Sequence, residues 1–303
     1  MSLRVLVSGA RGLIGSAFLP ALRARGHEVV ALTRRATGPG EVGWDPASGR
    51  LEAGALEGFD AVVHLAGEPL GARWTPARKA LIRESRVAGT RLLAGRLAGL
   101  ERPPRVLVSV SAIGFYGDRG EEPFDESSPP GTGFLATVCR AWEEAATPAA
   151  ERGIRVVHPR LGLVLTPRGG ALARMLPAFR LGLGGPLGDG RAWWSWVALD
   201  DVIGVLERSL ADSGLAGAVN VVAPASVRAG EFARTLGRVL GRPALLRVPA
   251  PALRLLFGEM ADGALLASAR VRPARLLAGG HAFRFPGLED ALVHLLGRRR
   301  PAA

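Results

Sequence analysis

The sequence predicts an α/β protein with a doubly wound parallel sheet and a smaller C-terminal lobe. Its 303 residues are 48% apolar and 22% charged, enough to bury a sizeable core. The 41 glycines and 22 prolines suit a loop-rich α/β protein better than a helical bundle. Short apolar runs alternate with helix-length segments through the first half. This alternation implies parallel strands joined by right-handed crossovers.

The elements follow in order along the chain. Strand-like runs cover 4–8, 28–33, 59–67, 105–110 and 154–159, and helices are predicted over 15–25, 75–97 and 132–152. After residue 165 come a glycine- and proline-rich stretch, a strand-like return over 193–199, a helix over 200–211 and a strand over 218–222. We therefore expect a sheet domain over 1–165, completed by about 195–225, and a smaller lobe from 166–194 and 226–303.

Composition narrows the classes of site and partner. Cys139 is the only cysteine and the five histidines share no metal-ligand spacing, so we expect no disulfide and no metal. The start of the chain has no signal-peptide pattern and no later run is apolar enough to span a bilayer, which predicts a cytoplasmic protein with no membrane partner. The formal charge is +12, but the arginines are scattered, so we expect no nucleic acid.

A glycine turn follows the first strand. Gly9, Gly12 and Gly15 lie between an apolar run and a helix, with Arg11, Leu13 and Ile14 between them. A dinucleotide pyrophosphate needs a tight turn, a backbone without Cβ at closest approach and a helix N-terminus facing the anion. An ordinary strand-to-helix turn is the alternative. The position within a βαβ unit favours dinucleotide binding.

The end of the second strand bears on the choice of dinucleotide. NAD-selective sites carry an acid there for the ribose 2′-hydroxyl, whereas a 2′-phosphate requires cations. This strand ends in Thr33, Arg34 and Arg35, and Arg11 in the glycine turn can reach the same point. Arginine is common in this chain, which is the alternative explanation. We predict NADP(H) as cofactor.

The spacing G-x-x-G-x-x-G resembles that of the short-chain dehydrogenase/reductase superfamily, and further landmarks resemble its extended, epimerase-like branch. Those landmarks are residues 60–67, Ser111 ahead of Phe115-Tyr116-Gly117, and residues 196–202. A narrower similarity, to epimerase-family proteins with a C-terminal DUF1731 segment, lies in residues 73–75, 85–87, 182–188, 220–224 and 241–286.

The resemblance implies a Rossmann-type sheet with a C-terminal substrate lobe and an unknown small-molecule substrate. It also implies cofactor contacts from His64, Leu65, Ala66 and Gly67. Arg86 stands where extended members usually carry asparagine, which implies another cofactor contact; a solvated helix face is the alternative.

One departure from the superfamily concerns proton transfer. Its members use a tyrosine followed four residues later by a lysine. This chain has one tyrosine, Tyr116, and one lysine, Lys79, in the wrong order and far apart. With the helix aligned on Glu143, the expected positions hold Leu135 and Cys139, and neither side chain can replace the pair.

Ser111 and Tyr116 remain as candidate catalytic residues. Ser111 fits the position that hydrogen-bonds a substrate oxygen, although a capping serine explains it equally well. Tyr116 is a candidate substitute acid, with a packed loop tyrosine as the commoner case. Cys139 is more simply a buried small residue. Trp193, Trp194 and Trp196 are candidates for an aromatic wall of the substrate cleft, with core packing as the alternative.

Two functions stay open at this stage. One is an NADP(H)-dependent epimerase or oxidoreductase that acts without the usual tyrosine–lysine pair. The other is a non-catalytic NADP(H)-binding regulatory protein. Some of the proteins it resembles are linked with cell or plastid division, which is compatible with either function. We expect a monomer or a homodimer.

Overall fold

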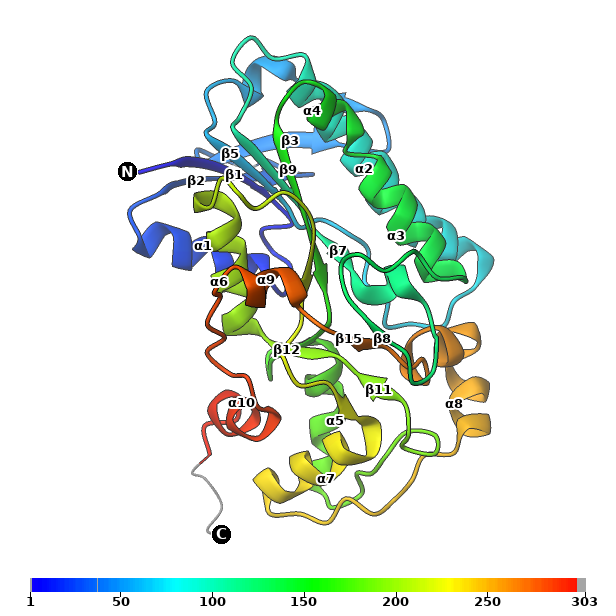
Figure 1. Cartoon of the computed structure of the whole chain (residues 1–303). Coiled ribbons are helices and arrows are strands. Elements are labelled where there is room, and N and C mark those ends of the chain that lie inside the picture. Colours follow the sequence, from blue (N-terminus) through cyan, green and yellow to red (C-terminus); the bar gives the residue numbers. More distant parts are fainter. Residues whose placement is uncertain (1, 37, 299–303) are drawn as a thin grey trace.

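A mainly parallel sheet forms the centre of the protein (Figure 1). The structure is a computed structural model that describes residues 2–36 and 38–298. Its strands lie in the order β13-β9-β6-β5-β1-β2-β3-β4. They are β1 (Arg4–Ser8), β2 (Glu28–Thr33), β3 (Glu41–Asp45), β4 (Arg50–Leu51), β5 (Ala61–His64), β6 (Val106–Ser109), β9 (Arg155–Leu161) and β13 (Gly217–Val221), with β7 (Ser111–Ala112) paired to β9.

Both faces of this sheet are buried, as parallel sheets require. Val5 and Val7 of β1 face a core formed with α1 (Gly15–Ala24) and α6 (Leu199–Ala211). Leu6 points the other way, into a core formed with α2 (Pro76–Ala98) and α4 (Thr147–Glu151). Figure 1 shows these helices on opposite sides of the strands. The predicted doubly wound, Rossmann-type sheet is confirmed.

Two local features differ from the prediction. The helix expected over 132–152 is two helices, α3 (Phe134–Glu144) and α4. The break lies where the Thr147 hydroxyl bonds the Glu144 carbonyl and Pro148 has no amide hydrogen to donate. The hairpin of β3 and β4, with the 3-10 turn η1 (Ala53–Leu56), was missed because its strands are short and carry glycine, aspartate and proline around them.

The remaining elements gather beyond the carboxyl ends of the strands. A second apolar core joins α5, α7 and α10 with short strands. The strand expected over 193–199 is split into two pieces that lie outside the main sheet. The elements are η2 (Ile113–Tyr116), β8 (Pro123–Phe124), β10 (Leu163–Leu165), α5 (Gly170–Arg180), β11 (Trp193–Trp194), β12 (Trp196–Ala198), β14 (Val227–Arg228), α7 (Ala229–Leu240), α8 (Ala250–Phe257), the π-helix η3 (Ala261–Leu265), β15 (Arg270–Val271), α9 (Ala274–Ala278) and α10 (Leu288–Leu295).

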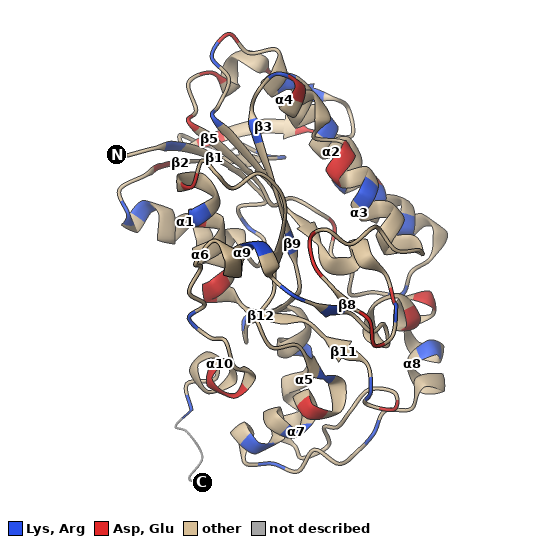
Figure 2. Ribbon diagram, in the orientation of Figure 1, with Lys and Arg blue, Asp and Glu red and all other residues tan. Residues whose placement is uncertain are grey.

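The C-terminal segment returns to the sheet. β15 pairs in parallel with β8, and α9 packs on β13. The carboxylate of Asp201, in the first turn of α6, accepts hydrogen bonds from the amides of Arg284 and Phe285. The division into domains at residues 165, 195 and 225 stays a prediction. No helix in the described ranges has both the length and the apolar character to cross a membrane. Arginines are spread along the ribbon (Figure 2).

Candidate functional site

Each of the three positions in the glycine turn has different surroundings. Gly9 has φ +69°, and a Cβ there would lie 2.7 Å from the backbone carbon of Leu65. A Cβ on Gly15 would lie 2.3 Å from the Gly9 carbonyl oxygen, so the fold itself requires glycine at this position. A Cβ on Gly12 would approach only that same oxygen, at 3.1 Å. A Cβ on Gly12 would therefore press on one backbone atom and meet nothing else within 4 Å among the described residues.

The first turn of α1 is open to an anion. Ile14 precedes the helix without a side-chain cap, and the first turn has no acidic residue. Among the described residues, the amides of Leu13 and Ile14 have no hydrogen-bond acceptor. Unpaired amides and the positive end of the helix dipole therefore meet beside Gly12. A pyrophosphate fits this cradle.

Ser8 joins the end of β1 to the end of β5. Its hydroxyl oxygen accepts from the amides of Leu65 (3.1 Å) and Ala66 (3.3 Å) and lies 2.6 Å from Nδ1 of His64. His64 is fully buried, and burial lowers the pKa of its imidazole to about 4, so the ring is neutral near pH 7. These contacts hold the 64–67 segment beside the glycine turn. The two segments predicted to contact the cofactor therefore lie next to each other.

Arg86 of α2 lies against the same segment. Its Nη1 donates to the carbonyls of Glu68 (3.0 Å) and Ile82 (3.1 Å), and its Cζ lies 3.2 Å from where a Gly67 Cβ would be. The guanidinium also lies 5.0 Å from the ring centroid of Trp142 on α3. Burial lowers the pKa of Arg86. This geometry argues against the alternative of a solvated helix face.

The cations at the end of β2 are exposed. Arg34 and Arg35 have no carboxylate partner among the described residues, whereas Arg11 lies 3.3 Å from the Glu41 carboxylate. The Thr33 hydroxyl accepts from the Arg35 amide at 3.4 Å. Glu41 is on β3, the strand that sequence reasoning missed. Of the three predicted arginines, two have no carboxylate partner in the described part of the chain, and the third has a competing acid.

Ser111 and Cys139 are neighbours at the carboxyl end of β6. The buried Ser111 hydroxyl has no oxygen or nitrogen partner among the described residues, and its neighbour is the Cys139 thiol. Burial raises the pKa of the Cys139 thiol to about 12, with the Glu143 carboxylate adding to the effect and the adjacent Ser111 hydroxyl opposing it. Leu135 joins an apolar cluster with Trp74. The expected positions of the acid–base pair thus hold a neutral thiol and an apolar side chain.

Tyr116 shares a buried cluster with Cys139, but its hydroxyl belongs to a separate polar network. Its hydroxyl donates to Oδ1 of Asn220 (2.8 Å) and accepts from Nη1 of Arg160 (2.8 Å). Arg160 also donates twice to the Glu143 carboxylate, at 2.8 Å each. Burial raises the pKa of the Tyr116 phenol. The catalytic role of Tyr116 stays a prediction, and these contacts favour a packed structural tyrosine.

The three tryptophans behave differently from one another. Trp196 is fully buried and Trp194 is nearly so, and both belong to the core of the C-terminal lobe. Trp193 is partly exposed, and its ring is flanked by the guanidinium groups of Arg228 and Arg270 at 4.5 and 4.6 Å. Core packing therefore accounts for two of the three, and guanidinium groups occupy the surroundings of the third.

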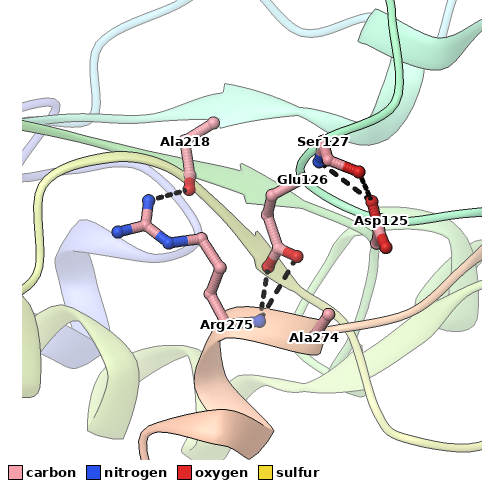
Figure 3. A pocket seen from close by; sticks show the side chains of 6 residues that line it. All are labelled: Asp125, Glu126, Ser127, Ala218, Ala274 and Arg275. Carbon is pink, nitrogen blue, oxygen red and sulfur yellow. Dashed lines mark hydrogen bonds between the residues drawn. The ribbon is translucent and has the colours of Figure 1, made fainter.

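A surface hollow lies beside β13, separated from β1 by β9, β6 and β5 (Figure 3). Both oxygens of the Glu126 carboxylate accept from the Arg275 amide, and the Arg275 guanidinium donates to the Ala218 carbonyl. The Asp125 carboxylate accepts from the Ser127 amide and hydroxyl. Because its polar groups satisfy one another, this hollow offers little to a ligand.

Two protein-family profiles match most of the chain. The profile of the NAD dependent epimerase/dehydratase family matches residues 5–222, and that of a domain of unknown function, DUF1731, matches residues 248–295. An epimerase family protein of Mycobacterium tuberculosis is 41% identical over 296 residues, 97% of this chain and 98% of that protein.

Two solved structures resemble this chain over nearly its whole length. The crystal structure of human epimerase family protein SDR39U1 (isoform 2) with NADPH has a TM-score of 0.89 to this chain at 37% identity, covering 97% of this chain and 99% of that one. A nucleoside-diphosphate sugar epimerase from Corynebacterium glutamicum has a TM-score of 0.81 at 38% identity, covering 98% of this chain and 59% of that one.

Proposed function

The chain belongs to the NAD-dependent epimerase/dehydratase family, and from that premise we propose that it binds NADPH at the carboxyl edge of the sheet. The observation that carries the proposal is the cradle at Gly12, where a Cβ would meet only the Gly9 carbonyl oxygen and where the amides of Leu13 and Ile14 have no acceptor in the described chain. The NADPH bound to human SDR39U1, a protein 38% identical over 299 residues, adds support.

The preference for the phosphorylated dinucleotide rests on Arg34 and Arg35. Both are exposed, free of carboxylates in the described chain and placed at the end of β2, where the adenosine ribose lies in Rossmann sites. Charge-assisted hydrogen bonds contribute about 1.5–3 kcal/mol each, so two of them give at least a tenfold preference for NADPH over NADH.

Titration calorimetry with both dinucleotides tests this preference. We expect the double variant R34A/R35A to lose at least tenfold in NADPH affinity while NADH affinity stays within twofold. R96A/R102A removes the same charge at two other exposed positions and serves as the control. Equal affinity of the unaltered protein for NADPH and NADH contradicts the proposal.

At the nicotinamide end we propose contacts from Gly67 and Arg86, with Ser111 facing the substrate position. NADPH supplies a hydride, and reduction of a carbonyl then needs a proton at the substrate oxygen. Leu135 has no proton to give, and the raised pKa of Cys139 makes it a poor acid at neutral pH. These features favour the non-catalytic, regulatory alternative over turnover of ordinary carbonyl substrates.

An oxidoreductase or epimerase function on an unknown small molecule is the second candidate, and Ser111 favours it. The buried Ser111 hydroxyl has no oxygen or nitrogen partner in the described chain and lies beside the Cys139 thiol, a weak hydrogen-bonding group, so a substrate oxygen is one group that can pair with it. NADPH consumption during a screen of carbonyl compounds and nucleotide sugars separates the two candidates. Turnover abolished by S111A, with NADPH affinity unchanged, supports the enzyme.

A further inference from the structure

Two adjacent loops outside the nucleotide site expose leucines and arginines together. The first follows α5 and the second follows α7. Their backbones are joined by the Leu246 amide donating to the Gly184 carbonyl (3.2 Å) and the Val248 amide donating to the Pro186 carbonyl (3.0 Å). We call this surface the leucine–arginine edge, and it consists of Arg180, Leu181, Leu183, Arg242, Leu245, Leu246 and Arg247.

The leucines are held outward by a fixed backbone. Leu181 is 74% exposed, Leu183 56%, Leu245 82% and Leu246 52%. A Cβ on Gly185 would collide with the Leu246 carbonyl, so the two loops are in direct backbone contact. Four exposed leucines therefore lie on two loops that are in backbone contact, and exposed apolar patches mark interaction sites.

The charge of the edge is of one sign. The sequence has no Asp or Glu between residues 152 and 188 or between 232 and 258. Arg180, Arg242 and Arg247 are exposed and form no ion pair within the described chain, and Nε of Arg242 donates to the Arg180 carbonyl (3.1 Å). Figure 2 shows the loop after α7 with basic residues and no acidic ones. A partner must therefore present negative charge together with an apolar interior.

We propose that the leucine–arginine edge docks on the surface of an anionic lipid bilayer. Leucines on the loops enter the boundary between headgroups and acyl chains, and the three guanidinium groups pair with lipid phosphates. A second copy of this chain fits poorly, because a symmetric contact would bring like charges together. A protein partner is less favoured, because the edge contains no aromatic residue of the kind that interface cores use. Surface docking needs no spanning helix.

Vesicle co-sedimentation with the full chain tests the proposal. One set of vesicles is phosphatidylcholine alone. The other contains about 30 mol% phosphatidylglycerol, which gives the surface a negative charge. We expect at least tenfold stronger partition onto the anionic vesicles, lost in about 0.5 M NaCl because salt screens the pairs. At about 1 kcal/mol per cation, R180Q/R247Q lowers partition about thirtyfold.

Substitution of the leucines distinguishes insertion into the bilayer from electrostatic attraction of a basic protein to its surface. L181S/L245S is expected to lower partition at least tenfold with charge unchanged. The matched controls, L81S and R83Q/R91Q on α2, keep full binding. NADPH affinity reports that each variant is folded. Equal binding to both vesicles, binding indifferent to L181S/L245S, or a dimer that this variant dissociates in sedimentation equilibrium would each overturn the proposal.

Discussion

Replacing Tyr116 by phenylalanine separates a structural tyrosine from a catalytic one. The ring, fully buried and stacked on Phe124 at 5.5 Å, is retained, so only the hydroxyl is lost. That hydroxyl serves two partners, Asn220 and the guanidinium of Arg160. A hydrogen bond to a charged group contributes about 1.5–3 kcal/mol and a neutral one about 0.5–1.5 kcal/mol. We expect Y116F to lower the free energy of unfolding by about 2–4 kcal/mol.

The assay is urea unfolding followed by tryptophan fluorescence, with NADPH affinity measured on the folded variant. T137V removes an exposed hydroxyl on α3 and is the control, expected within about 0.5 kcal/mol of the unaltered protein. NADPH affinity should stay within twofold, because Tyr116 contacts neither the glycine turn nor Arg86. A stability change under about 0.5 kcal/mol, or a tenfold loss of NADPH affinity, would refute the reasoning.

Three further outcomes follow from the site. Gly12→Val should weaken NADPH binding at least a hundredfold by calorimetry. It should destabilise the fold less than Gly15→Ala, because the added Cβ would lie 3.1 Å from the Gly9 oxygen at position 12 and 2.3 Å from it at position 15. A G12V variant that binds normally would move the site elsewhere. The neutral, buried His64 has its pKa lowered to about 4, so the unfolded state binds more protons between about pH 6.5 and 4 and stability falls as the pH drops through that range. H64N should flatten this fall, and an identical pH profile would contradict it. Cys139, with its thiol pKa raised to about 12, should resist alkylation by iodoacetamide at pH 8 in native protein and react in urea.

Sequence alone determined the elements whose causes are local. A glycine turn between a strand and a helix is set by backbone sterics over a few residues. Gly9, Gly12 and Gly15 could therefore be predicted, from their spacing alone, to form a pyrophosphate-binding turn. The fold class followed from the alternation of strands and helices. The β3–β4 hairpin was not predicted because β3 contains Gly43 and charged ends and β4 has only two residues, and Glu41, the acid beside Arg11, was missed with it.

Tertiary structure decided which side chains meet across long separations. The hydroxyl of Tyr116 and the amide of Asn220 are 104 positions apart, and no periodicity relates them. Their contact depends on the packing of η2 against β9 and β13, which buries the phenol and pairs it with Arg160. The same holds for the leucine–arginine edge, whose two loops lie about sixty residues apart. Local chemistry can be predicted from a chain, but burial and long-range pairing depend on how the folded chain brings its distant parts together.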